Sequence, residues 1–438
     1  MSGTARPTQY SPAMVRKVIA ASFIGTTIEW YDFFLYGTAS ALVFNQLFFP
    51  NFSDAAGTLA AFGTFAAGFL ARPLGGVVFG HFGDRVGRKS MLVASLVMMG
   101  AATFLIGLLP SYATIGVLAP VLLTLLRLMQ GFAVGGEWGG AVLMAVEHSP
   151  PGRRGFAGSW PQSGSPAGLV LATGAFAAAA TMPDDAFLAW GWRIPFLLSA
   201  LLVAVGLFIR LRMYESPEFA AVRDAGQEPR IPVLEAVRSH PRNLLMAIGA
   251  CLAPFLNFYL FAVFVLSYAT ETLGIAESDA LLVVAIAAGL EVFTIPAAAA
   301  LSDRVGRRVV FLSGAVAFAL FAYPFFWVND VADGSVLVFG VSTVIGLTLV
   351  HPFMYGPLAV LFTEMFEARV RYSATSLGYQ IGGMLGGGFA PLILSALLAS
   401  QGGAPWAIPP YMILLALLTF GAVYVATSRT RTPGEVPV

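Results

Sequence analysis

Residues 80–89 read GHFGDRVGRK and stand between two long apolar runs, which predicts a short basic loop at one face of a membrane. Residues 301–308 read LSDRVGRR and repeat the pattern. The two acids, Asp84 and Asp303, lie 219 positions apart, which is half of the 438 residues. An internal repeat of this length predicts a polytopic membrane protein built from two parallel halves.

Other residues recur at nearly the same offset, so chance is a poor explanation of the repeat. Three pairs of identical residues lie 217 or 218 positions apart: Glu147 and Glu364, Arg154 and Arg371, and Gln162 and Gln380. The second copy of the loop lacks the two glycines, Gly80 and Gly83, of the first.

The composition excludes several classes of protein. Hydrophobic residues make up 58% of the chain and charged residues 11%, whereas a soluble domain has about 25% charged residues. The net charge of +1 gives no basic surface for nucleic acid. A single cysteine, Cys251, excludes an intrachain disulfide and a cysteine metal cluster. We therefore expect a membrane protein in contact with the lipid bilayer, without a metal, a cofactor or a nucleic-acid partner.

Twelve apolar runs are long enough to cross a bilayer, which predicts an all-α protein with twelve transmembrane helices in two six-helix bundles. The expected domains are residues 1–211, a hydrophilic linker at 212–242, and residues 243–438. The runs lie near residues 18–46, 56–79, 90–110, 114–145, 156–181, 190–211, 243–270, 280–300, 308–328, 336–362, 373–399 and 408–427.

Most of the 24 Lys and Arg residues lie in the two termini, the linker and the loops at one face, while the opposite loops carry acids. Because basic loops stay inside the cell, both termini should be cytoplasmic.

Ionisable residues inside the spans are functional candidates, because a charge in hydrocarbon is costly unless it is paired or hydrated. Asp32 and Arg127 each lie about ten residues from the outer end of their spans, roughly 15 Å deep. This common depth predicts an ion pair in which the acid titrates, or a static pair that joins two helices. The other ionisable residues in spans are Glu29, Arg72, Glu137, Glu291 and His351.

Arg127 begins a strip of small residues, because Gly131 and Gly135 follow at four-residue spacing on one helix face. The strip predicts close approach of a neighbouring helix. Glu137 lies on another face and deeper, where it would line a cavity or brace the loops at the cytoplasmic face.

The stretch RPLGGVVFGHFGDRVGRK at residues 72–89 resembles the loop signature of the major facilitator superfamily. The stretches EWYDFFLYG, RLMQGFAVGGEWGGA, WGWRIPF, MYESPEF and RYSATSLGYQ resemble the metabolite:proton symporters within it. GTLAAFGTF and GYQIGGMLGGGF are most similar to the shikimate-carrier branch. The resemblance covers roughly residues 16–427 and implies two six-helix bundles that rock around a central cavity, giving alternating access.

The resemblance also implies roles for individual residues. Asp32 and Arg127 match the proton-coupling acid and arginine of related sugar–proton carriers, and Glu29 lies one turn before the acid. A conformational latch between the halves is expected at the basic loops and the inner helix ends. Its members would be Asp84, Arg85, Gly87, Arg88, Lys89, Glu147, Asp303, Arg304, Arg307 and Glu364.

Polar and aromatic residues near mid-span are candidates to contact a substrate. Gln162 and Gln380 occupy equivalent places in the two halves, and His351 could titrate or bond a neighbouring helix. Arg127 is the basic residue that we place at the midplane, with Arg72 or His351 as a second cation for a dicarboxylate. The candidates are Arg127, Tyr36, Trp138, Gln162, Asn257, Tyr259, His351, Tyr355 and Gln380.

These features predict a monomeric proton-coupled symporter of a bacterial inner membrane that imports a small carboxylate, most simply a shikimate-like monocarboxylate. The alternatives are a proton symporter for a zwitterionic osmolyte such as proline or betaine, or for a di- or tricarboxylate such as α-ketoglutarate or citrate. A channel or a transport-like receptor without coupling is a more distant alternative. An enzyme is not expected, because no nucleophile–base pair, metal spacing or phosphate-binding loop occurs in the sequence.

Overall fold

The computed structural model describes residues 12–51, 54–212, 232–368 and 370–428. Every regular element in these residues is a helix, and they contain no strand. The predicted all-α fold class is therefore confirmed.

The first half contains six long helices, of which the first is continued by a π-helical turn. They are α1 (Pro12–Ala39) with η1 (Ser40–Phe44) and α2 (Asn45–Phe48), then α3 (Asp54–Gly83), α4 (Arg88–Leu108), α6 (Leu118–Glu147), α7 (Arg154–Ala179) and α9 (Arg193–Leu211). Short elements connect them: α5 (Tyr112–Ile115), η2 (Pro151–Arg153), α8 (Asp184–Ala186) and η3 (Phe187–Gly191).

The second half repeats this order, with π-helical turns inside three of its long helices. It contains α12 (Pro241–Tyr259) with η4 (Leu260–Phe264), α13 (Val265–Ser267) and η5 (Tyr268–Thr272), then α14 (Glu277–Val305), α15 (Arg307–Val331), α16 (Val336–Val344) with η6 (Ile345–Val350) and α17 (His351–Met365), α18 (Arg371–Gly383) with η7 (Met384–Gly388) and α19 (Ala390–Ser400), and η8 (Pro405–Ala407) with α20 (Ile408–Ser428).

Eleven of the described helical segments are long and apolar enough to cross a membrane. The twelfth, α7, is 26 residues long but contains the polar stretch GSWPQSGSPAG at residues 158–168. We count it as a span because its polar face is covered by the other half of the protein, as described below. The linker predicted at 212–242 falls largely outside the described residues, apart from the short helix α11 (Pro232–Ser239).

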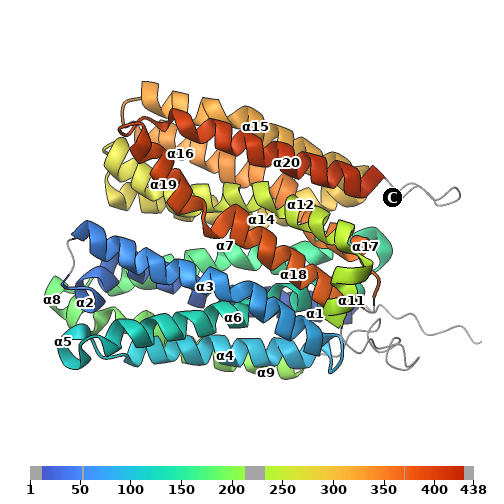
Figure 1. Ribbon diagram of the computed structural model, residues 1–438, viewed down its shortest axis with the longest axis horizontal. Helices are drawn as coiled ribbons and strands as arrows, with labels where there is room; N and C mark the ends of the chain where they lie inside the picture. Colours follow the sequence, from blue (N-terminus) through green and yellow to red (C-terminus); the bar gives the residue numbers. More distant parts are fainter. Residues whose placement is uncertain (1–11, 52–53, 213–231, 369, 429–438) are drawn as a thin grey trace, which may run out of the picture.

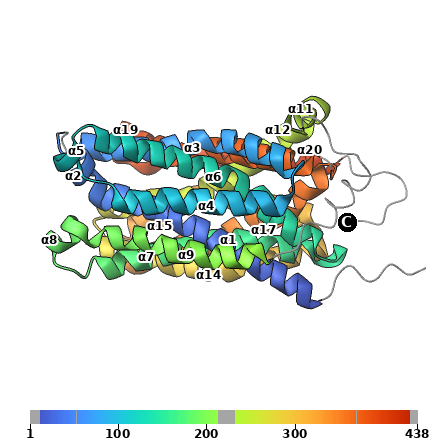
Figure 2. The same ribbon diagram turned by 90° about the horizontal axis from the view of Figure 1, so that it is seen from below.

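The two halves lie side by side (Figure 1). They meet where α7 packs against α14 and α17, and where α18 packs against α3 and α6. Helix α1 begins and α20 ends at the same end of the bundle, which also carries α11, whereas α2, α5 and α8 lie at the opposite end (Figures 1 and 2). We call the end with α11 the latch end.

Glycines set the spacing between α3 and α6. A Cβ atom added to Gly131 would lie 1.9 Å from the carbonyl oxygen of Gly68, and one added to Gly135 would lie 2.3 Å from that of Arg72. No side chain fits in these gaps, so the two backbones touch. The predicted small-residue strip after Arg127 is confirmed as a packing surface. It sets the distance between α3, which carries Arg72, and α6, which carries Arg127.

Candidate functional site

Two carboxylates at the latch end reach across to the opposite half and cap a helix there. Asp84 Oδ2 accepts hydrogen bonds from the main-chain N of Ser373 (2.9 Å) and from its hydroxyl (2.8 Å), at the N-terminus of α18. Asp303 accepts from the main-chain N of Gly155 and of Phe156, both at 2.9 Å, at the N-terminus of α7. A negative charge at a helix N-terminus satisfies free N–H groups and the helix dipole. The two repeated segments, with Asp84 just after α3 and Asp303 in the last turn of α14, thus hold the halves together reciprocally.

Ion pairs support each cap. Glu147 pairs with Arg88 of its own half and, at 3.0 Å, with Arg371 of the other. In the second copy Arg307 pairs with Glu364 at 3.0 Å and with Asp303 at 3.3 Å. These contacts agree with the latch expected from the sequence, although its role in transport remains a prediction.

The loop residues of the predicted latch separate into two groups. Gly87 and Gly306 have φ of +122° and +97°, a conformation that glycine adopts without strain, and each directly precedes the next helix. Lys89 Nζ donates to the carbonyl of Leu211 at 2.8 Å, at the end of α9. Arg85 and Arg304 are exposed instead, and the contact described for Arg85 is with His81 in the last turn of the preceding helix α3. The structure places these two arginines outside the joined surface.

Tyr372 fills the space that the glycines of the first loop leave open. A Cβ atom on Gly83 would lie 1.9 Å from its ring, and its hydroxyl donates to the carbonyl of Gly136 on α6. Burial raises the pKa of Asp84, which accepts from the neighbouring Ser373, to about 6, although the nearby Arg88 and the hydrogen bonds from α18 oppose this shift. The closed latch therefore binds a proton more tightly than a hydrated carboxylate does.

Deeper in the bundle, Asp32 faces α9 rather than Arg127. Its Oδ1 accepts from the Ser199 hydroxyl at 2.5 Å, and its Oδ2 has no hydrogen-bond partner. In the described part of the chain Asp32 and Arg127 form no ion pair, so the direct pair predicted from their depth is wrong. Equal depth fixes the height of two side chains but not the directions in which they point.

A chain of polar side chains joins the two residues instead. Arg127 Nη1 donates to Gln130 Oε1 at 3.1 Å, and Gln130 Nε2 donates to the Thr103 hydroxyl at 2.8 Å. Thr103 in turn lies beside the Asp32 carboxylate. The Thr103 hydroxyl itself donates to the Met99 carbonyl at 3.0 Å, so it could accept a hydrogen bond from Asp32 only when Asp32 is protonated. The sequence showed Gln130, three residues after Arg127, but gave no reason to single it out.

Arg127 and Arg72 are fully buried and have no carboxylate partner among the described residues. The Arg127 guanidinium lies 4.2 Å from the ring centre of Phe33 and 4.4 Å from that of Tyr36. Arg72 lies 5.5 Å from Phe33 and 4.9 Å from Phe69. Two nitrogens of each guanidinium make no hydrogen bond. A buried cation without an anion is strongly destabilising, so this arrangement is suited to an anionic ligand.

Arg72 also corrects the expectation that Arg127 is the basic residue at the centre of the protein. Its Nε donates to Gln380 Oε1 at 2.9 Å, across the interface between the halves, and Tyr259 of the second half lies beside it. The sequence marked Arg72 as intramembrane, but its approach to Arg127 depends on the glycine contacts between α3 and α6.

The two predicted glutamines join the halves through main-chain carbonyls. Gln162 Nε2 donates to Tyr355 O at 2.6 Å and also contacts Gly356 O. Gln380 Nε2 donates to Gly135 O at 3.0 Å. Both amides are therefore engaged in this closed arrangement. A role for either in substrate binding remains a prediction that requires these bonds to break.

A small cavity between the halves contains three of the predicted substrate contacts. Tyr259, His351 and Tyr355 line it together with Trp30, Ser165, Pro254, Phe255 and Phe258. Its volume is about 10 Å³, room for about one water molecule. The structure is therefore closed around its centre, and a substrate would need the halves to separate.

The predicted contacts at and away from this cavity have different partners. His351 directly follows the π-helical turn η6 and forms a short contact with the buried Glu291. Tyr355 is hydrogen-bonded to Tyr379 at 2.7 Å, and Trp138 of the first half stacks on Tyr379 at 3.7 Å. Tyr36 donates to Thr64 at 2.7 Å, and both side-chain polar atoms of buried Asn257 lack a partner.

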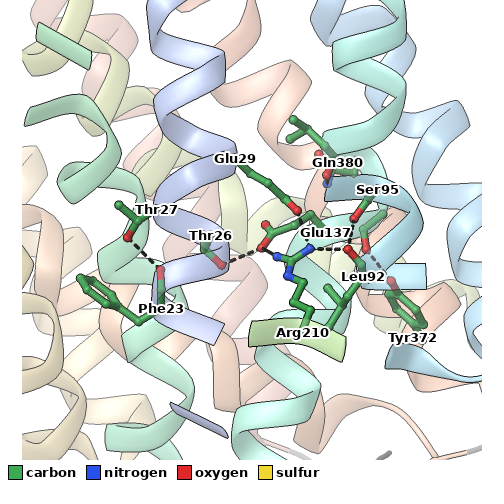
Figure 3. Close-up of polar contacts among 12 residues, drawn as sticks. Phe23, Thr26, Thr27, Glu29, Leu92, Ser95, Glu137, Arg210, Tyr372 and Gln380 are labelled. Carbon is green, nitrogen blue, oxygen red and sulfur yellow. Dashed lines mark hydrogen bonds and ion pairs between the residues drawn. The ribbon is translucent and has the colours of Figure 1, made fainter. Parts of the chain in front are cut away.

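Glu29 and Glu137 meet at a third arginine, Arg210, which was not among the intramembrane charges predicted from the sequence (Figure 3). Arg210 lies 2.7 Å from Glu29 Oε1 and 3.3 Å from Glu137 Oε1. Helical side chains lean toward the N-terminus of their helix. Arg210 in the last turn of α9 therefore points back into the bundle. The partners described for Glu137 are Thr26 and Arg210, and neither of the two roles predicted for it, lining the cavity or bracing the loops, is seen among the described residues.

Comparisons with known proteins agree with this architecture. The family model described as Major Facilitator Superfamily matches residues 22–391 and 246–438. The shikimate transporter of Escherichia coli K12 is 44% identical over 412 residues, covering 93% of this chain and 94% of that protein. The proline/betaine transporter of the same organism is 35% identical, covering 97% and 86%.

A solved structure shows the same fold at low sequence identity. The proton:xylose symporter bound to 6-bromo-6-deoxy-D-glucose superposes with a TM-score of 0.74 at 20% identity, covering 94% of this chain and 97% of that one. The twelve-helix fold and the resemblance to shikimate-type carriers, both predicted from sequence, are confirmed. The chain belongs to the major facilitator superfamily of membrane transporters.

Proposed function

We propose that this transporter is a proton-coupled symporter that imports a small organic acid. The observation that carries the proposal is the pair of buried arginines, Arg72 and Arg127, whose guanidinium groups both lie on Phe33 and have nitrogens without partners. A carboxylate can accept two parallel hydrogen bonds from one guanidinium. It would also supply the negative charge that the site lacks.

Asp32 is the proposed coupling acid. With Asp32 ionised the three groups carry a net charge of +1, and a proton together with a monocarboxylate leaves that charge unchanged. A proton alone would raise it to +2, which a buried site resists. A monocarboxylate alone would make the site neutral, so in this proposal the coupling depends on ionised Asp32 repelling the substrate carboxylate until the proton binds. Because protonation turns an acceptor into a donor, it would rearrange the Thr103–Gln130 chain and so reorient Arg127 toward the substrate.

The latch end is proposed to face the cytoplasm, since the basic loops lie there. The protein would then work as a monomer in a bacterial inner membrane, with the closed latch representing the state shut toward the cytoplasm. Substrate released into the cytoplasm would require the Asp84 and Asp303 caps to break.

The 44% identity to the shikimate transporter favours a cyclic monocarboxylate as the substrate of this chain. The second arginine also makes a dicarboxylate compatible with the site. A zwitterionic osmolyte is the second candidate, because Trp30, Phe255 and Phe258 line the cavity and aromatic faces attract ammonium groups.

Uptake by liposomes that contain the purified protein tests the proposal. A pH gradient with the acidic side outside should drive accumulation of at least one labelled organic acid inside the liposomes. Proline and betaine are screened beside the acids. Accumulation that ignores the pH gradient for every substrate would contradict proton coupling, and transport of betaine alone would transfer the proposal to the osmolyte class.

A further inference from the structure

Three buried charges in the first half do not balance. Glu29, Glu137 and Arg210 are each at most 2% exposed, and two carboxylates face one guanidinium. If all three were ionised, the cluster would hold a net negative charge in a low-dielectric interior. Such a charge costs several kcal/mol, so a further positive charge belongs at this site. We call these three residues the Glu–Arg–Glu cluster.

The other polar groups of the cluster supply no such charge. Thr26 of α1 donates to Glu137 Oε1 at 2.6 Å, and the Leu92 carbonyl of α4 accepts from Arg210. Glu29 Oε2 has no partner. Gly25 leaves the room that the guanidinium occupies, since a Cβ atom there would lie 2.6 Å from Arg210 Nη2. The carboxylate oxygen without a partner is a free position for a proton.

Tyr372 brings the second half of the protein to this cluster (Figure 3). Its ring lies against Gly83 and Gly139, and its hydroxyl bonds Gly136 O, one residue before Glu137. Tyr372 lies close enough to interact electrostatically with Glu137 and Arg210 of the cluster and with Asp84 and Arg88 of the first loop. Arg88 is already paired with Glu147. The ring thus stands between the cluster and the latch.

We propose that Glu29 and Glu137 share one proton while the latch is closed, and that this second proton site releases it to the latch-end solution when Tyr372 withdraws. The proposal deepens the proposed function, on which the link to transport rests. Withdrawal of α18 would admit water to the cluster, and hydration favours the ionised form of the second carboxyl. Proton release would thereby be tied to opening at the latch end and not only to Asp32.

Infrared spectroscopy of the purified protein at neutral pH tests the site without any transport assay. A protonated carboxyl has its own C=O stretching band. The band of the cluster should disappear in Glu29→Gln and equally in Glu137→Gln, because either change leaves one carboxylate balanced by Arg210. It should persist in Asp32→Asn, the matched control in the same helix bundle. Arg210→Met should add a second band, since two carboxyls then lack a cation.

A second measurement tests the link to the latch. Ser376 is buried against Gly139 of the first half, so a Ser376→Cys reporter in a Cys251→Ala background reports opening. Over the range where the cluster titrates, its contribution to opening should increase about tenfold per pH unit. Glu137→Gln should remove that contribution while Asp84, present in both proteins, contributes equally.

Two results would overturn the proposal. One is an infrared spectrum unchanged by Glu29→Gln and Glu137→Gln, which would mean that both carboxylates are ionised or that a metal cation balances them. The other is an unchanged pH dependence of Ser376→Cys labelling in Glu137→Gln. Failure of proton-driven uptake with the infrared bands as expected would instead count against the proposed function and leave the proton site standing.

Discussion

Asp84 accepts two hydrogen bonds from Ser373, a residue 289 positions further along the chain in the other half of the protein. Asp84 directly follows α3 in one half, and Ser373 lies in the first turn of α18 in the other. Asp303 makes the same kind of contact with Gly155 and Phe156. Separation of the halves at this end would break both caps, so we expect each carboxylate to influence an equilibrium between a closed and an open arrangement.

The first prediction concerns the pH dependence of the latch. Asp84 has a pKa of about 6 in the closed latch, and a hydrated Asp has a pKa of about 3.9. The closed state therefore binds the proton more tightly. This contribution to closure is fully present below about pH 4 and is lost as the pH rises through about 6. Opening should become about a hundredfold easier across that range.

Asp84→Asn should abolish this step, because the amide stays neutral at every pH. The variant should favour the closed latch, transport slowly and still bind substrate. Labelling of the Ser376→Cys reporter between pH 4 and pH 8 measures the change, with Arg85→Gln as the exposed control on the same loop. Labelling by Asp84→Asn with the full pH dependence of the parent would show that another group is responsible.

The second prediction concerns the space occupied by Tyr372. Gly83→Ala would place a methyl group 1.9 Å from the Tyr372 ring, and overpacking of this kind costs about 1–3 kcal/mol. The latch should open about tenfold more often, which Ser376→Cys labelling would detect. Gly174→Ala is the matched control, because nothing lies within 4 Å of the added atom. If the clash is the cause, the effect of Gly83→Ala should vanish in a Tyr372→Ala background.

The apolar runs and the repeated loop were enough to predict the fold and the existence of two equivalent loops. Both depend on spacing along the chain: run length gives the helices, and the 219-residue offset gives the second loop. The latch was expected only from the family resemblance, and its role in transport stays a prediction. Asp84 and Asp303 behave as this symmetry suggests, and Gly87 and Gly306 both have positive φ. Arg85 and Arg304 share the motif but are exposed, because a motif does not say which side of its turn faces the partner.

The interior of the site could not be predicted in the same way. The depth of Asp32 and Arg127 was clear from sequence, but their rotation about the helix axes was not, so the polar chain through Thr103 and Gln130 was missed. Arg210 was missed because it ends a span, where arginine is usually an interfacial anchor. Its direction followed from the lean of helical side chains, and that rule could have identified it.

The third prediction concerns coupling. Asp32→Asn imitates the protonated acid and keeps a group that can accept from Ser199. The variant should retain substrate binding and counterflow exchange but lose accumulation driven by a pH gradient. Counterflow and uptake in the same liposomes separate the two activities. Accumulation against a gradient at the level of the parent protein would exclude Asp32 as the coupling acid.

The fourth prediction concerns the two arginines. Lysine keeps the charge but loses the planar, two-pronged donor, so Arg72→Lys and Arg127→Lys should each lose hydrogen bonds of about 1.5–3 kcal/mol to a carboxylate. Substrate binding should weaken by about tenfold to a hundredfold. Arg85→Lys, on the exposed side of the loop, should bind normally. Unchanged affinity in both buried variants would remove the arginines from the substrate site.

The last prediction separates the classes of substrate by the charge that moves. One proton carried with a monocarboxylate moves no net charge, so uptake should follow the pH gradient and ignore the membrane potential. Each pH unit then supplies about 1.4 kcal/mol, or at most about tenfold accumulation. A proton carried with a zwitterion moves one positive charge inward, so an inside-negative potential adds about 2.3 kcal/mol of driving force per 100 mV.

Valinomycin-imposed potentials at fixed pH, on liposomes that contain the purified protein, measure this difference directly. A monocarboxylate carrier should show the same uptake rate at every imposed potential, and that uptake should depend on Arg127. A dicarboxylate carried with one proton moves one negative charge inward, so an inside-negative potential should slow it, and Arg72→Lys should then impair uptake as much as Arg127→Lys. Strong stimulation by an inside-negative potential, together with normal uptake in both arginine variants, would contradict the organic-acid proposal and favour an osmolyte carrier.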